Sequence, residues 1–410
     1  MGRYPWTEVF LLELLRILVF YPTRHRVYRL LILAAMIYLA AQIYLTPEVT
    51  DPLSITYTVG GTIPLAFAYA AHVLYGQGPF PDHWRRVRDE VHAEADADRL
   101  DNLPSNFSFV KKLWWMLDLA YSIRMIGWVQ EPRDSLPSRP PPSRQTFFWK
   151  TFLKLIVNLA IVDLTTIVFA QSPAFDSRVH DPSDGPETYL AAVPLPHRAP
   201  YILALALMMA CGFSAVHNLM ALTCVGIGRS SPTLWPDIGG RWEDSYTLRK
   251  FWGRTWHQRM RLTVAGLGKL VANKTLKFPR GTKRSSYVQL YLAFFLSGIF
   301  HFAGDFMYEK RFVSRSFKFF LLQAVAITFE DFVLSLAKRY LPQSGIESKL
   351  RDAGWSWLEV VVRVVGYCWV ILWFCLTVPV WMDESSAAGF GIANRGPIAQ
   401  FLMDTWKKRV

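Results

Sequence analysis

Cysteine and acidic residues are scarce in this chain. Only four of its 410 residues are cysteine, and 32 acidic residues stand against 45 Lys and Arg, for a formal net charge of +13. All four cysteines lie inside apolar stretches: Cys211, Cys224, Cys368 and Cys375. We therefore expect small buried thiols rather than disulfides. The basic residues lie between apolar stretches instead of forming one face, which argues against a nucleic-acid partner.

Several signatures of soluble enzymes are missing as well. The chain has no Gly-rich phosphate loop, no GxSxG elbow and no paired CxxC. His83 and His92 stand in a charged stretch without further ligands nearby, which does not suggest a metal site. We expect neither a metal ion nor a permanently bound cofactor.

Long apolar stretches are abundant, because 52% of the residues are hydrophobic and 15% are aromatic. A hydrocarbon core about 30 Å thick takes roughly 20 helical residues to cross. The predicted spans are Leu30–Leu45, Leu53–Tyr75, Phe152–Ala170, Tyr201–Val225, Tyr287–Phe306, Phe317–Ala337 and Trp357–Val380. Trp6–Tyr21 and Leu113–Val129 carry charges and are either tilted spans or interfacial helices. The sequence predicts an all-α, polytopic transmembrane bundle of about seven to nine membrane helices, in a single domain over residues 1–410.

Loop charges predict the orientation of these spans. The segment Gly226–Ser286 holds thirteen Lys and Arg against three acidic residues, which is typical of a cytosolic loop. Thr46–Pro52 and Gln171–Pro200 are acidic and are expected on the lumenal side. Glu309–Arg315 is basic although it would be lumenal, so the topology around residues 306–316 stays open. We expect an integral membrane protein of the endoplasmic reticulum or another endomembrane.

The stretch Tyr246–Leu262 predicts an amphipathic helix, with Trp252 and Trp256 on its apolar face and His257 on its polar face. Two interpretations are open. The helix lies in the cytosolic interface with Trp and Arg as anchors, or His257 lies at the edge of a cavity with cations close by for a phosphorylated ligand.

The stretch Tyr287–Asp305 places His301 late in an apolar span, with Asp305 one turn further on. An ionisable side chain at membrane depth is costly and indicates a functional site. A neutral imidazole can take the proton of an attacking hydroxyl, and a carboxylate one turn away can orient it. The alternative is a histidine that only packs against a neighbouring helix. Glu330 and Asp331 lie near the centre of another span, so at least one is expected to have a partner or a polar cavity.

The segments Tyr246–Gln258 and Ser297–Asp305 resemble the membrane-bound O-acyltransferase superfamily. More narrowly, they are similar to its wax-synthase-like branch in fungal natural-product pathways, whose members acetylate terpenoid hydroxyls. The first segment is similar to that branch's SL-x-x-FW-G-x-x-WHQ signature, and the second to its SG-x-x-H segment. Leu234-Trp-Pro236 precedes the first motif as it does in relatives. The specific match covers roughly residues 235–305.

The resemblance implies roles for several residues. His301 stands at the position of the general base, and His257 stands where many superfamily members have Asn or Asp. His257 is expected to be catalytic as well, and two roles stay open for it: it orients the thioester or stabilises its oxyanion, or it moves a proton. The residues expected to shape the site or to contact coenzyme A are Trp252, Trp256, Arg249 and Arg254. The resemblance also implies a helical bundle with a tunnel, which the thioester enters from the cytosol and the acceptor from the membrane.

The function predicted in this way is transfer of an acetyl group from acetyl-CoA, the cosubstrate, to a hydroxyl of a lipophilic terpenoid-type alcohol. One alternative is a long-chain wax or sterol ester synthase. Another, of a different class, is a transporter of a lipophilic metabolite, although no internal repeat is evident. Expected partners are acyl-CoA, the lipophilic alcohol and membrane lipid, and a homo-oligomer is an open possibility.

Overall fold

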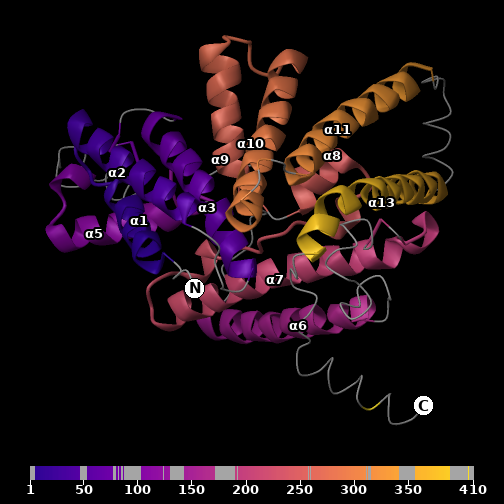
Figure 1. Ribbon diagram of the computed structural model, residues 1–410, viewed down its shortest axis with the longest axis horizontal. Coiled ribbons are helices and arrows are strands. Elements are labelled where there is room, and N and C mark those ends of the chain that lie inside the picture. The colour runs from indigo at the N-terminus through magenta and orange to yellow at the C-terminus, as the bar shows by residue number, and fades with distance from the viewer. Residues whose placement is uncertain are drawn as a thin grey trace. The chain divides into compact units, whose positions relative to one another are not determined.

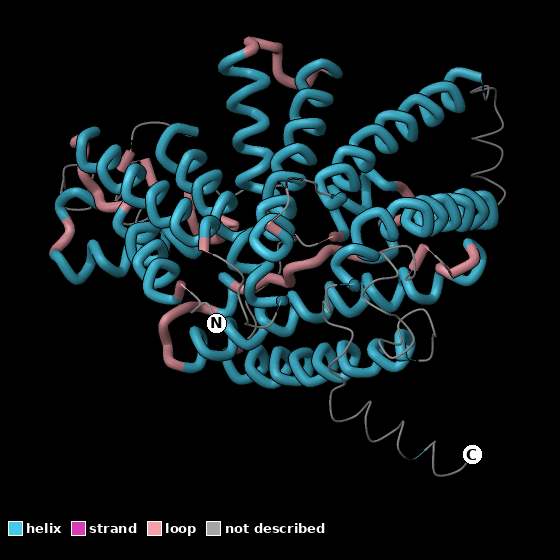
Figure 2. The backbone as a smooth tube through the Cα atoms, in the orientation of Figure 1, coloured by secondary structure: helices cyan, strands magenta, loops and turns pink. Residues whose placement is uncertain are grey.

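The structure is a computed structural model of the 410-residue chain. It describes residues 5–46, 53–76, 80–81, 83–84, 86, 103–122, 124–129, 143–170, 190–191, 193–256, 258, 260–310, 312, 315–340, 356–387 and 405. Within these ranges the chain consists of helices joined by turns and loops, without a strand (Figure 2). The chain divides into two compact units, which are described in turn.

The first unit comprises Met1–Pro142, Ser230–Pro236 and Arg259–Phe317. Its helices are α1 (Trp6–Leu18), α2 (Arg26–Leu45), α3 (Leu53–Ala71), α5 (Phe109–Tyr121), α9 (Arg261–Lys269) and α10 (Lys283–Glu309). The π-helical segments η1 (His72–Gly76) and η11 (Leu270–Thr275) continue α3 and α9. Short 3₁₀ turns are η3 (Pro104–Asn106) and η8 (Pro232–Leu234). Helices α9 and α10 run side by side (Figure 1).

The second unit comprises Ser143–Arg229, Asp237–Gln258 and Lys318–Val410. Its elements are α6 (Arg144–Ala170), η7 (Leu195–His197), α7 (Ala199–Gly226), η9 (Trp242–Asp244), α8 (Leu248–Lys250), the π-helix η10 (Phe251–Thr255), α11 (Arg315–Tyr340) and α13 (Ser356–Ala387). The first residues of α11 belong to the first unit. Helices α6 and α7 pack along each other over most of their length (Figure 1).

Six of the described helices are long and apolar enough to cross a membrane: Arg26–Leu45, Arg144–Phe169, Leu195–Gly226, Lys283–Met307, Arg315–Ala337 and Val360–Met382. They match six of the seven predicted spans. The seventh, Leu53–Tyr75, forms helix α3 and η1 but is not among the six. Helices α1 and α5 have 13 residues each, about 20 Å at 1.5 Å per residue, which is too short for a straight crossing. The fold class, a polytopic helical membrane bundle, is confirmed.

Aromatic side chains form the core of the first unit around the end of α3. Phe20, Trp84 and Trp128 are fully buried there. The Tyr69 hydroxyl donates to the Leu119 carbonyl at 2.6 Å, and the Trp84 indole donates to the Val73 carbonyl at 2.9 Å. These bonds satisfy the hydroxyl of Tyr69 and the indole N–H of Trp84 in the core.

His72 lies in the same core. It is 0% exposed, stands edge-on to Trp84 and packs so closely on Gly266 that a Cβ there would lie 2.1 Å from its Cε1 atom. This close contact with α9 favours a packing role for His72.

Helices α3 and α10 approach each other through glycine. A Cβ atom at Gly60 would lie 2.6 Å from the Ala303 carbonyl oxygen, and one at Gly304 would lie 2.9 Å from the ring of Tyr57. A side chain at either position would force the helices apart, because such distances are well inside van der Waals contact. The absence of side chains here brings residue 57 of α3 beside the turn of α10 that carries His301.

The four cysteines are free thiols, as expected. Cys211 and Cys375 are buried and Cys224 is half-buried, in agreement with the predicted apolar role. Cys368 is exposed on α13, so the prediction that all four are buried is wrong at this position. Its place within the span Val360–Met382 leaves this thiol on a surface available to lipid.

Candidate active site

His301 lies in the sixth turn of α10 and is half-buried. Its Nδ1 atom is 2.6 Å from the hydroxyl oxygen of Tyr57, in the first turns of α3. The two ring centroids are 6.1 Å apart, with the planes inclined by 44°. In a neutral imidazole one nitrogen carries the proton and the other accepts, so the direction of this bond fixes which nitrogen of His301 is protonated.

Asp305, the predicted orienting carboxylate, is 8% exposed. Its Oδ2 atom accepts a short hydrogen bond from the hydroxyl of Ser316, at the start of α11. The contact ties the end of α10 to the beginning of the next helix. Asp305 thus has a bond to Ser316, while Tyr57 contacts His301 through Nδ1.

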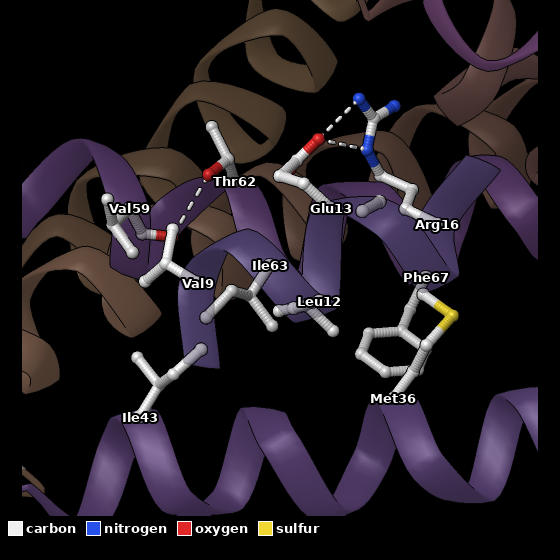
Figure 3. A pocket seen from close by; sticks show the side chains of 11 residues that line it. Val9, Leu12, Glu13, Arg16, Met36, Ile43, Val59, Thr62, Ile63 and Phe67 are labelled. Carbon is white, nitrogen blue, oxygen red and sulfur yellow. Dashed lines mark hydrogen bonds and ion pairs between the residues drawn. The ribbon is translucent and has the colours of Figure 1, made fainter. Parts of the chain in front are cut away.

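A small cavity of about 100 Å³ lies between α1, α2 and α3 (Figure 3). Val59, Ile63 and Phe67 line it from α3, and the ion pair of Glu13 with Arg16 lies at its edge. Its lining does not include Tyr57 or His301. Pockets that enclose drug-sized ligands usually measure about 300–1,000 Å³, so this cavity is too small for a terpenoid acceptor.

The segment predicted as one helix over Tyr246–Leu262 is broken, and that prediction is wrong. Helix α8 covers only Leu248–Lys250, after Thr247 caps it through its side chain. The next turn is a π-helix, closed by the Trp256 N–H bonding to the Phe251 carbonyl at 2.8 Å, and Trp256 itself is extended. π-turns of this kind occur frequently at functional sites.

Backbone pairing explains why the helix stops at this point. Gly240 N–H donates to the Thr255 carbonyl at 2.9 Å, and Gln258 N–H donates to the Ile238 carbonyl at 2.9 Å. A Cβ atom at Gly240 would lie 2.0 Å from the carbonyl oxygen of Arg254. Only glycine permits this approach, which pairs Thr255 and Gln258 with residues 238–240. His257 itself lies outside the described residues.

Two adjacent carboxylates of α11 hold the beginning of this segment. The buried Glu330 side chain accepts the backbone N–H groups of Leu248 at 2.7 Å and of Arg249 at 3.2 Å. Asp331 forms a two-point ion pair with the Arg249 guanidinium, at 2.9 Å to Nε and with a shorter contact to Nη2. Both carboxylates therefore have partners, as expected for acidic side chains within a membrane span.

The π-helix lies in an aromatic cluster of the second unit. Phe251 stacks on Trp256 at 5.4 Å and contacts Phe374 of α13 at 4.8 Å between ring centroids. The side-chain oxygen of Gln323, which is 0% exposed, accepts from the indoles of Trp373 at 3.0 Å and Trp252 at 3.4 Å. The predicted site residues Trp252 and Trp256 are thus held by rings and by one buried amide.

Comparison with known proteins assigns the chain to a family. Residues 235–322 match the Membrane bound O-acyl transferase family. The chain is 32% identical to the acetyltransferase ple2 of Rhodocybe pseudopiperita over 297 residues, which cover 72% of this chain and 71% of the relative. It is 32% identical to the acetyltransferase eriL of Hericium erinaceus over 70% of each chain. The chain belongs to the membrane-bound O-acyltransferase family. No solved structure matches it.

A third relative, the acetyltransferase aurG of Calcarisporium arbuscula, is 25% identical over 74% of this chain and 72% of its own length. The predicted resemblance to a fungal natural-product branch is confirmed by these relatives. The chain is an O-acyltransferase, an enzyme integral to the membrane that uses an acyl donor and an acceptor. The transporter alternative is not supported.

The matched region 235–322 of this O-acyltransferase contains every predicted site residue. His301 and Asp305 lie in the first unit, and Arg249, Trp252, Arg254 and Trp256 lie in the second. Arg254 is exposed on the π-helix.

Two polar residues in contact with these were not found from the sequence: Tyr57 and Gln323. Tyr57 precedes the motifs by about half the chain and carries no local signal. Gln323 is a lone amide in a predicted span, and its polarity at membrane depth could have drawn attention to it.

Proposed function

We propose that this O-acyltransferase moves an acetyl group from acetyl-CoA to a hydroxyl of a lipophilic, terpenoid-type alcohol, with His301 as the general base. The observation that carries the proposal is the half-buried imidazole of His301 in an apolar helix, with its Nδ1 atom in contact with the Tyr57 hydroxyl. With Nδ1 engaged in this way, we assign the proton transfer to Nε2. The names of the fungal acetyltransferase relatives support acetyl as the transferred group.

In the proposed reaction, Nε2 of neutral His301 takes the proton of the acceptor hydroxyl while the hydroxyl oxygen attacks the thioester carbonyl. The new C–O bond forms and the C–S bond breaks. The proton then passes from the imidazolium to the departing thiolate. The ester and free coenzyme A leave, and His301 returns to its neutral form.

Further contacts are proposed for the residues of the first motif. Trp252 and Trp256 are held in the aromatic cluster, and Thr255 and Gln258 are paired with Gly240 and Ile238 through backbone hydrogen bonds. We assign His257 to the thioester carbonyl, as a donor to the developing oxyanion. Arg254 is exposed and can meet a phosphate of coenzyme A.

Membranes that contain the protein test this proposal. They are incubated with labelled acetyl-CoA or palmitoyl-CoA and with terpenoid alcohols, sterols and fatty alcohols. We expect acetyl transfer to a terpenoid alcohol. We also expect a loss of about 10²- to 10⁴-fold in the His301→Ala variant, which is the usual contribution of a positioned base.

The exposed His25, at the start of α2, offers a matched control, and His25→Ala should retain full turnover. Transfer of palmitoyl to a fatty alcohol or sterol would instead establish the long-chain ester synthase. Unchanged acetyl transfer in the His301→Ala variant would remove His301 from its assigned role.

We also place the enzyme in the endoplasmic reticulum or another endomembrane, with the basic segment Gly226–Ser286 on the cytosolic side, where acyl-CoA is available. Protease protection of a tag inserted between Pro279 and Thr282 in intact microsomes tests this orientation. Cleavage without detergent is expected, and protection would reverse the assignment.

A further inference from the structure

The contact between Tyr57 and His301 joins residues 244 positions apart in the sequence. The contact joins helices α3 and α10, whose backbones touch. The backbone packing therefore sets the distance between Tyr57 and His301, without flexible side chains in between. The ring of Tyr57 lies over Gly304, one turn beyond His301, where a Cβ atom would be 2.9 Å from the ring and 3.0 Å from the Tyr57 carbonyl oxygen. Gly61 repeats the close approach on α3, where a Cβ atom would be 3.0 Å from the Phe300 carbonyl oxygen.

The direction of this hydrogen bond decides which nitrogen of His301 can act. A tyrosine hydroxyl can donate or accept, and a neutral imidazole carries its proton on one nitrogen only. If Nδ1 carries the proton and donates to the hydroxyl oxygen, Nε2 is the unprotonated nitrogen and is the one that can accept the proton of an alcohol. The same bond becomes stronger when the ring gains its second proton, because the donor is then charged.

We propose that Tyr57 is a positioning residue for His301: its hydroxyl oxygen accepts a hydrogen bond from Nδ1–H, selects the tautomer in which Nε2 is unprotonated and stabilises the imidazolium formed during acyl transfer. The proposal rests on the proposed role of His301 as the base. Tyr57 forms and breaks no covalent bond in this scheme and keeps its own proton.

Tyr57 takes a function that carboxylates often have beside a catalytic histidine. The nearest carboxylate along α10, Asp305, holds the hydroxyl of Ser316. A neutral phenol oxygen is a weaker acceptor than a carboxylate, and it suits a buried site because no second charge has to be desolvated.

Tyr44 offers a matched control. Its hydroxyl donates to the Gly60 carbonyl of α3, also at 2.6 Å. Tyr44→Phe therefore removes a hydroxyl of the same chemistry at the same helix, with a bond of the same length, but without touching His301. A purely structural role would make the Tyr57→Phe and Tyr44→Phe variants behave alike.

The pH dependence of turnover separates the two roles. Activity should rise with pH as the imidazolium loses its proton, and the loss of the Tyr57 oxygen should make that proton easier to remove. Among the described residues, the titratable and charged groups on α10 and on the elements packed against it are Lys283, Arg284, Tyr287, Tyr291, Asp305, Lys310, Arg315, Tyr44, Tyr57, Tyr69, Arg261, Lys269 and Lys274. None of them is a second histidine, and burial lowers the pKa of Lys310.

The experiment measures kcat, KM for both substrates and the pH profile of kcat for the unaltered enzyme and for Tyr57→Phe, Tyr44→Phe and His301→Ala. For Tyr57→Phe we expect kcat to fall about tenfold, the worth of one hydrogen bond, with little change in KM. We also expect the acidic limb of its profile to move to lower pH. Tyr44→Phe should keep the profile of the unaltered enzyme.

The outcomes separate this proposal from the proposed function. A Tyr57→Phe profile that coincides with that of the unaltered enzyme, while His301→Ala is inactive, would overturn the role of Tyr57 and leave the base in place. Activity in His301→Ala would overturn the base itself. If Tyr57→Phe does not extract as a folded protein, a fluorinated tyrosine at position 57 retains the bond but weakens the acceptor. It should move the acidic limb in the same direction by less, and no movement would overturn the proposal.

Discussion

The carboxylate of Glu330 accepts the backbone N–H of Leu248 at 2.7 Å, although the two residues are 82 positions apart in the chain. Glu330 also accepts from Arg249 N–H at 3.2 Å and from the Trp369 indole at 3.1 Å. Three donors converge on one carboxylate that is 7% exposed. Glu330 therefore caps the segment that carries Trp252 and Trp256, and it joins that segment to α11 and α13.

Replacement of Glu330 tests this cap. Glu330→Gln keeps the size of the side chain but removes its charge and replaces one acceptor oxygen with an NH₂ group. We expect a loss of about 1–3 kcal/mol of stability, the usual cost of a buried polar group left without its partner, seen as a lower midpoint of thermal unfolding in detergent. Glu243→Gln is the matched control, because that side chain is 64% exposed and pairs with the exposed Arg241. An equal shift in both variants would contradict the cap.

The ion pair of Arg249 with Asp331 is expected to shape the segment rather than to bind the donor. Arg249→Ala and Asp331→Ala should lower the thermal midpoint by similar amounts, and the double variant should add little to either. The coupling should be below about 1 kcal/mol, because the Arg249 side chain is 41% exposed and solvent screens the pair. A higher KM for acyl-CoA in Arg249→Ala alone would show that this guanidinium also contacts the donor.

Because α3 and α10 touch at glycines, a single added methyl group at Gly304 should strongly affect both stability and turnover. Gly304→Ala would place its Cβ atom 2.9 Å from the Tyr57 ring, so the helices must separate and the hydroxyl must leave Nδ1. We expect a loss of about 1–3 kcal/mol of stability from overpacking, together with reduced kcat. Gly212→Ala in α7 is the control, since among the described residues no atom outside its own stretch of helix lies within 4 Å of its Cβ position. It should be neutral or stabilising.

The buried amide of Gln323 is expected to position Trp252. Gln323→Leu leaves the indoles of Trp252 and Trp373 without the oxygen that they now share. We expect a lower thermal midpoint and a weaker interaction with acyl-CoA, measured as a higher KM. Gln42→Leu, at an exposed position of α2, should change neither quantity. If Gln323→Leu lowers stability without changing KM, Trp252 belongs to the core alone.

The membrane helices could be predicted from the sequence because each is a local property of about 20 apolar residues. The general location of the motifs could be predicted as well, since His301 is an ionisable side chain inside such a stretch. The break at Trp256 could not be predicted. The periodicity of residues 246–262 suits a helix, and the opposing signal, the approach of Gly240 to Arg254, depends on how the chain folds back.

The contact of Tyr57 with His301 also could not be predicted, for a related reason. Local spacing draws attention to Asp305, four residues further along the same helix, but gives no sign of Tyr57, which reaches the imidazole because glycines let two distant helices touch. Pairings of this kind depend on long-range packing and leave no trace in local periodicity.

Backbone contact between α3 and α10 has a mechanical consequence. Most neighbouring helices are separated by side chains, which can change conformation when the bilayer thickens or when a bulky ligand binds. Where glycines bring two backbones into contact, no such side chain lies between them. Helices α3 and α10 should therefore tilt and shift together as one rigid body. The distance between Tyr57 and His301 should then stay constant while other helices move. Turnover in vesicles of increasing acyl-chain length is expected to change through substrate access, with the pH profile unaltered.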